Sequence, residues 1–136
     1  MKCYIVVVSL DHCYVAVSDG IIQACHGKLA PMKRLAAGDK VILYANKQSL
    51  GSNVPIRRFV SIGTVTEDEP YQYEMFHGFC PFRRNVVYDS CAREVNIYDL
   101  MSQLSFTQSK SWGMYLRYGF FEISIDDYRI IESSML

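Results

Sequence analysis

The stretch IIQACHGKLAPMKRLAAGDKVILY, from Ile21 to Tyr44, decides how this chain is expected to fold. The apolar pair at its start predicts a strand over residues 21–24, Pro31 predicts the opening of a short helical turn, and Gly38-Asp39 predicts the turn into a buried strand over 40–44. The first strand therefore ends in a polar tip, and donors at the open end of a sheet beside a cationic side chain favour a recognition pocket. The tip consists of Gln23, Cys25, His26, Gly27 and Lys28.

The rest of the chain predicts further short strands and helices. Residues 3–8 form a β-branched apolar run typical of a buried strand, which ends at Ser9, and residues 11–17 suit a short helix closed at Asp19-Gly20. Residues 40–45 and 58–66 predict a long hairpin, and residues 82–88 another strand. Residues 98–104 predict a short helix, and Ser124 with Asp127 predicts the start of a C-terminal helix. This irregular order favours an α+β protein with a curled mixed sheet or small barrel and peripheral helices.

Length, charge and cysteine content limit the class of protein. The 136 residues suit one domain over 1–136, and no apolar run approaches the roughly 18 residues of a membrane span. Five cysteines without a CxxC pair indicate reduced thiols in the cytoplasm rather than disulfides. With 14 basic and 14 acidic residues the formal charge is zero, so any nucleic-acid binding is expected to be local. No membrane association and no cofactor are expected.

Catalysis is a weaker interpretation of the polar tip. Cys25 and His26 resemble a nucleophile and its base, but neighbours on a strand point to opposite faces and seldom meet. The histidines and cysteines lack the spacing of a zinc site, and the chain has no glycine-rich phosphate loop. A non-catalytic chain without a metal is therefore the prediction.

Aromatic and basic residues offer a better indication, because nucleobases stack on rings while a local cation meets the phosphate. Arg83, Arg84 and Arg117 are interleaved with rings, and Trp112 is the only tryptophan. The alternative for Trp112 is a place in the core beneath a loop. The candidate rings are Trp112, Phe79, Phe82, Tyr115 and Tyr118.

Several blocks in this order resemble the bacterial EVE-domain proteins. The blocks are VSLDH (8–12), IIQACHGKLAPMKRLAAGDKVILY (21–44), SIGTV (61–65), GFCPFRR (78–84), LSF (104–106) and WGMYLRYGFFEIS (112–124). The resemblance covers almost the entire chain. It implies a PUA-like fold, a curved mixed β-barrel with short peripheral helices, related to the YTH and ASCH domains. It also implies a nucleic-acid partner, DNA or RNA, that carries a modified base such as methylated or hydroxymethylated cytosine or methylated adenine.

By this resemblance the pocket lies where the first strand ends, beside the polar tip, and is closed by the Trp112 loop. Some relatives place a tryptophan where this chain has Gln23, which predicts an altered aromatic cage. Ser9 and Gln23 would bond a base edge and Trp112 would stack on the base. His12 and His26 would either orient their neighbours or meet the polar edge of the ligand, and Cys25 would belong to the wall that the polar tip forms. The phosphate contacts would be Lys28, Arg84 and Arg117.

Two other functions use the same residues. A sensor would take a free nucleoside or metabolite in the same pocket, and a base-modifying enzyme would act through Cys25 or His26. A monomer is the expected oligomeric state.

Overall fold

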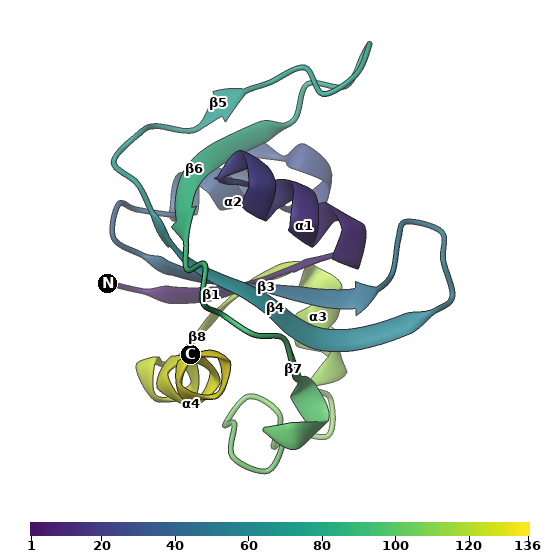
Figure 1. The fold of residues 1–136 in the computed structure, drawn as a ribbon, viewed down its shortest axis with the longest axis vertical. Helices are drawn as coiled ribbons and strands as arrows, with labels where there is room; N and C mark the ends of the chain where they lie inside the picture. Colours follow the sequence, from purple (N-terminus) through teal and green to yellow (C-terminus); the bar gives the residue numbers. More distant parts are fainter.

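The computed structural model describes all residues 1–136 and shows one curled sheet with helices on both sides (Figure 1). The strands are β1 (Cys3–Val8), β2 (Ile21–Ile22), β3 (Lys40–Lys47), β4 (Pro55–Val65), β5 (Tyr71–Gln72), β6 (Phe82–Tyr88), β7 (Val95–Asn96) and β8 (Phe120–Ile123). The α-helices are α1 (Leu10–Asp19), α2 (Leu29–Arg34), α3 (Gly113–Tyr118) and α4 (Ile125–Met135). Two short 3₁₀ segments, η1 (Cys25–Gly27) and η2 (Ile97–Asp99), complete the chain.

The sheet is mixed and runs in the order β2-β6-β4-β3-β1-β8. β1 pairs with β3 in parallel, whereas β3 and β4 form the predicted antiparallel hairpin, with register shifts at Leu43/Tyr44 and Ala45/Lys47. Such bulges increase local twist. The sheet curls into a half-barrel in which β5 and β6 lie on the same side as α1 and α2, while α3 and α4 lie on the other side (Figure 1). The predicted α+β class is confirmed.

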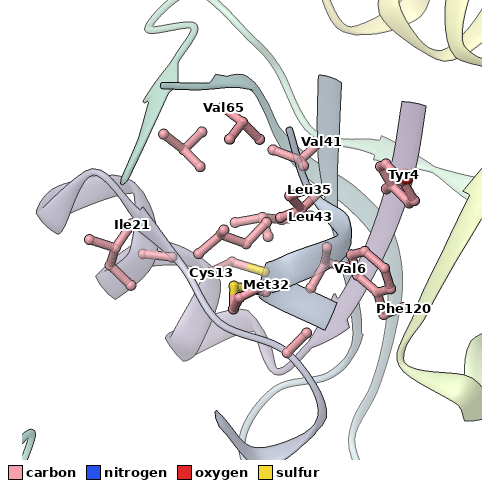
Figure 2. Close-up of a cluster of buried hydrophobic side chains, with 14 of the residues drawn as sticks. Tyr4, Val6, Cys13, Ile21, Met32, Leu35, Val41, Leu43, Val65 and Phe120 are labelled. Carbon is pink, nitrogen blue, oxygen red and sulfur yellow. The ribbon is translucent and has the colours of Figure 1, made fainter. Parts of the chain in front are cut away.

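Alternation along the central strands divides the buried side chains between the two faces of the sheet. In β1, Tyr4 and Val6 belong to one cluster, and Cys3 and Ile5 belong to the other. The first cluster, shown in Figure 2, gathers Met32 and other side chains from α1 and α2 against this face. The second cluster packs under α4 and the segment that follows β7. Because successive residues of a strand face opposite sides, β1 is buried on both faces, as its continuous apolar run predicts.

Two predicted helix boundaries are confirmed by their caps. α1 ends at Gly20, whose φ of 66° is the left-handed conformation typical of a helix end. α4 begins after Ser124, whose hydroxyl accepts a hydrogen bond from the backbone N–H of Asp127 at 3.1 Å. The carboxylate of Asp127 is itself buried and accepts hydrogen bonds from the N–H of Ser105 at 2.8 Å and of Phe106 at 3.2 Å. It therefore ties the helix to the preceding loop.

Three expectations about local structure were wrong. The strand expected over 21–24 contains only Ile21–Ile22, because the chain leaves the sheet at Gln23. α2 begins at Leu29, two residues before Pro31, which is still within the first turn where a missing N–H is tolerated. The helix expected over 98–104 is the 3₁₀ segment Ile97–Asp99 followed by turns, and the side chains of Thr107 and Gln108 bond the carbonyls of Met101 and Leu104 in these turns.

Candidate functional site

The polar tip forms a left-handed loop, by which we mean residues 24–28. Cys25, His26 and Gly27 have φ angles of 52°, 61° and 82°, and the N–H of Gly27 bonds the carbonyl of Ala24 at 3.0 Å. For a residue with a Cβ this region costs roughly 1–2 kcal/mol. Two such residues in succession persist only where their surroundings enforce the conformation, and such strain gathers at functional sites.

Contacts from two distant parts of the chain hold this loop in place. On one side, a Cβ built on Gly27 would lie 2.4 Å from Cβ of Pro81 and 3.7 Å from Cζ of Phe79. On the other side, the thiol of Cys25 donates to the carbonyl of Tyr118 at 3.4 Å. The loop is therefore bracketed between the start of β6 and the end of α3, where three of the sequence blocks meet.

Gln23 and Arg83 form a buried polar pair beside the loop. The side-chain oxygen of Gln23 accepts hydrogen bonds from Nη2 of Arg83 at 2.6 Å and from Nε at 3.1 Å. The Arg83 guanidinium lies 4.3 Å from the centre of the Tyr73 ring, in cation–π geometry, and the Gln23 amide also lies 3.5 Å from Sδ of Met75. Arg83 has no carboxylate partner, since the ion pair of this chain joins Arg58 to Glu94.

The pair presents donors rather than acceptors to a ligand. Because the Gln23 oxygen is occupied by Arg83, the amide N–H groups are what Gln23 retains for another partner. Nη1 of Arg83 makes no hydrogen bond within the chain, and its charge is not neutralised. A buried unpaired cation is costly, so an anionic or acceptor-rich ligand is what this arrangement favours.

Ser9 and His12 lie at the start of α1, and their polar atoms are arranged around Asp11. The Ser9 hydroxyl donates to Oδ1 of Asp11 at 2.5 Å, and the same oxygen accepts from the His12 N–H at 2.8 Å. Nε2 of His12 is buried without a hydrogen-bond partner. Burial lowers the pKa of His12 below 6.5, Asp11 opposes this shift, and the charge of Arg83 adds to it. The ring is therefore a neutral, unpartnered group close to the Gln23–Arg83 pair.

Stability is expected to fall in acid because of His12. Its pKa is lowered in the folded state, so the unfolded chain binds the proton more tightly and the stabilisation present above pH 6.5 is lost as the pH falls below that value. Urea unfolding of the His12→Gln variant should show a shallower decline between neutral and weakly acidic pH than the wild type. His77→Gln, at an exposed histidine, is the matched control. Parallel wild-type and His12→Gln profiles would contradict the assignment.

Arg84 does not face a ligand, contrary to the expected phosphate contact. Its guanidinium is buried and donates to the carbonyl of Leu35, to that of Thr66 at 3.1 Å and to that of Asp68 at 2.7 Å. Adjacent strand residues face opposite sides, so Arg83 occupies the position beside Gln23 and Arg84 joins the loops behind β6. The structure thus gives Arg84 a structural role, and Arg83 is the residue that sequence reasoning left out of the site.

Trp112 and Gln23 lie on different sides of the sheet. Trp112 is half-buried against the second cluster, whereas the residues on either side of Gln23 belong to the first. The expected closure of the site by the Trp112 ring is therefore not what the structure shows. Arg117, His26 and Lys28 are exposed, the first on α3 and the others in the left-handed loop. From α3 it is the backbone of Tyr118 that reaches the loop.

The surface cavities lie away from the left-handed loop, and the side chains that a metal site requires are not grouped together. A surface cavity of about 380 Å³ lies against α4, and another of about 450 Å³ lies against α1. Asp89 and Ser90 line both cavities. No group of three or more His, Cys, Asp or Glu side chains is placed to hold a metal ion, and all five cysteines are free. None of the helices has the length and apolar character that crossing a membrane requires.

The curled half-barrel with short helices defines an α+β protein of PUA-like fold. The family model of the EVE domain matches residues 3–134, and the chain belongs to that family. It is 42% identical over 135 residues to a UPF0310 protein of Mesorhizobium japonicum, and the aligned region covers 97% of this chain and 90% of that relative. It is 38% identical over 129 residues to a UPF0310 protein from Bacillus licheniformis, and the aligned region covers 94% of this chain and 87% of that relative.

Solved structures agree on the fold. A hypothetical protein from Leishmania major superposes with a TM-score of 0.63 at 13% identity, covering 98% of this chain and 94% of that one. A protein from Pseudomonas putida gives a TM-score of 0.61 at 12% identity and covers 98% of this chain and 99% of its own. At this identity the likeness establishes the fold alone.

Proposed function

We propose that this chain is a non-catalytic nucleic-acid-binding module that recognises a modified base at the Gln23–Arg83 pair and the left-handed loop. The observation that carries the proposal is the buried, unneutralised guanidinium of Arg83 next to an amide that retains only donors. Base edges and phosphates supply the acceptors that such a pair requires.

The surroundings of the pair suit an unstacked base. Tyr73 and Phe79 place rings beside Arg83 and Gly27, respectively, and bases stack on such rings with roughly 1–3 kcal/mol each. His26 and Lys28 are exposed in the adjacent left-handed loop, where they supply polar and cationic contacts to the sugar-phosphate backbone of the bound nucleic acid. Met75 lies against the end of the Gln23 amide that Arg83 also bonds, where a flexible thioether side chain adapts to a neighbouring ligand.

Neither the thiol nor the histidine of the loop supports catalysis. Cys25 uses its thiol on the carbonyl of Tyr118, and His26 is exposed at a neighbouring position of the left-handed turn. No hydrogen bond joins the two side chains, and a nucleophile requires a base within such reach.

The Gln23→Glu variant should separate binding from folding. The carboxylate keeps the acceptor that Arg83 bonds, but it removes the amide donors and neutralises the guanidinium. Affinity for strands carrying the modified base should fall roughly tenfold to 100-fold, the equivalent of about 1.5–3 kcal/mol, while the melting temperature is retained. Fluorescence anisotropy measures this with labelled strands carrying 5-methylcytosine, 5-hydroxymethylcytosine, N6-methyladenine or no modification.

Gln103→Glu is the matched control, because Gln103 is exposed and the net charge changes equally. If the wild type binds none of the strands at low salt, or binds modified and unmodified strands alike, the proposal fails. Equal affinity for a free modified nucleoside and for the strand would instead identify a small-molecule sensor.

A further inference from the structure

The hairpin between β5 and β6 ends in an exposed cluster of rings, which we call the aromatic tip (residues 73–80). Phe76 is 65% exposed and Tyr73 54% exposed, whereas Phe79 is half-buried. In Figure 1 this loop extends beyond the rest of the fold next to the upper ends of β5 and β6. Two large rings on one short hairpin that the chain itself leaves uncovered indicate an interaction site.

The aromatic tip is held in one shape by its own backbone. The N–H of Phe79 bonds the carbonyl of Phe76 at 2.9 Å, and the N–H of Met75 bonds the carbonyl of Phe79 at 3.1 Å. Gly78, with a φ of 84°, supplies the turn. The rings of Phe76 and Phe79 are stacked, with centroids 5.0 Å apart and planes inclined by 28°. The exposed Phe76 ring is thus presented on a preorganised support.

The aromatic tip is continuous with the Gln23–Arg83 site. Phe79 lies beside Gly27 of the left-handed loop, Met75 lies against Gln23, and Tyr73 lies under Arg83. Phe76 is therefore one stacked ring away from the loop. The aromatic tip carries one carboxylate, that of the exposed Glu74, while Arg83 and Lys28 place two cations in the adjoining site, so the balance of these charges is compatible with a polyanion.

We infer that Phe76 is a wedge that enters the base stack of double-stranded DNA and fills the space left when the modified base turns out toward Gln23 and Arg83. This inference rests on the proposed function. Proteins that unstack a duplex insert apolar side chains between base steps, and extrusion of a base costs a few kcal/mol that such an insertion offsets. A rigid ring beside the receiving site meets that requirement.

The geometry of the aromatic tip favours DNA over double-stranded RNA. A two-stranded β-ribbon fits the major groove of B-form DNA, which is about 12 Å wide. The major groove of A-form RNA is deep and narrow and excludes such an element. A single strand needs no wedge, because its bases are already unpaired.

The test compares Phe76→Ala with the wild type on a DNA duplex and on the corresponding single strand, each with one modified base next to 2-aminopurine. The fluorescence of 2-aminopurine rises when its neighbour leaves the stack. The wedge predicts that Phe76→Ala binds the duplex roughly tenfold to 100-fold more weakly and loses the fluorescence rise, while its affinity for the single strand stays within about threefold. Phe76→Trp should retain both duplex signals.

Leu50→Ala is the matched control, since Leu50 is 77% exposed at the tip of the β3–β4 hairpin. Equal losses on duplex and single strand, or no loss on either, would overturn the wedge and leave the proposed function intact. If the wild-type chain discriminates the modified base only in single strands, the wedge is likewise overturned and the proposed function remains. A wild-type chain that binds neither substrate would overturn the proposed function itself.

Discussion

The Arg84→Met variant is expected to lose about 3–5 kcal/mol of unfolding free energy, because three backbone carbonyls lose their charged donor and an unsatisfied buried polar group costs roughly 1–3 kcal/mol. Methionine replaces the aliphatic stem of arginine but leaves the carbonyls of Leu35, Thr66 and Asp68 without their donor. Hydrogen bonds from a charged group contribute roughly 1.5–3 kcal/mol each, and relief of the buried charge offsets part of their loss. Urea unfolding followed by circular dichroism measures the change.

Arg117→Met is the control for Arg84, because Arg117 is exposed on α3 and surface substitutions usually stay within about 0.5 kcal/mol. If Arg84→Met leaves stability unchanged and weakens nucleic-acid binding, Arg84 contacts phosphate, as the sequence alone suggests. Loss of stability in Arg84→Met together with loss of binding in Gln23→Glu would assign the two neighbouring arginines to separate tasks.

Gly27→Ala is the second substitution for which a large effect is expected, a loss of about 2–5 kcal/mol. The left-handed φ of 82° accounts for roughly 1–2 kcal/mol of this, and the clash with Pro81 at 2.4 Å accounts for roughly 1–3 kcal/mol. The clash involves the backbone and ring of a proline, which cannot rotate away. Chemical denaturation gives the stability, and the binding assay described for Gln23→Glu shows whether the displaced loop still recognises its ligand.

Gly38→Ala separates the two contributions to the Gly27 effect. Gly38 has a similar φ of 88°, but nothing lies within 4 Å of the position that its Cβ would take. The Gly38→Ala variant should therefore lose only the roughly 1–2 kcal/mol of unfolding free energy that a left-handed backbone costs a residue with a Cβ. If both variants lose the same amount, the contact between the left-handed loop and β6 relaxes easily and does not hold the loop.

Local features of the sequence predicted much of the fold. The apolar run of β1, the glycine after α1 and the serine before α4 act through burial, backbone freedom and capping within a few residues of themselves. The local pattern failed over residues 98–104. This segment forms a 3₁₀ turn and further turns instead of the expected helix, and the side chains of Thr107 and Gln108 bond the carbonyls of Met101 and Leu104 at its end.

The candidate site was predicted only in part. The sequence identified Gln23 and the left-handed loop as a polar tip at the end of a strand, and it placed PFRR among the informative blocks. It offered no means to choose between Arg83 and Arg84, because the choice depends on pairing with other strands. Tyr71 of β5 pairs with Arg83 and Ile22 of β2 pairs with Arg84, which sets the register of β6 on both sides.

The sequence by itself determined the class of fold, the termini of its best-capped helices and the loop in which polar groups gather, since each depends on neighbouring residues. The tertiary structure alone decided which arginine meets Gln23, that Trp112 packs away from it, and that Cys25 and His26 adopt a left-handed turn. The physical reason is that these outcomes arise from contacts among β6, α3 and the left-handed loop. Pro81 and the carbonyl of Tyr118 impose on that loop a backbone that its own residues disfavour.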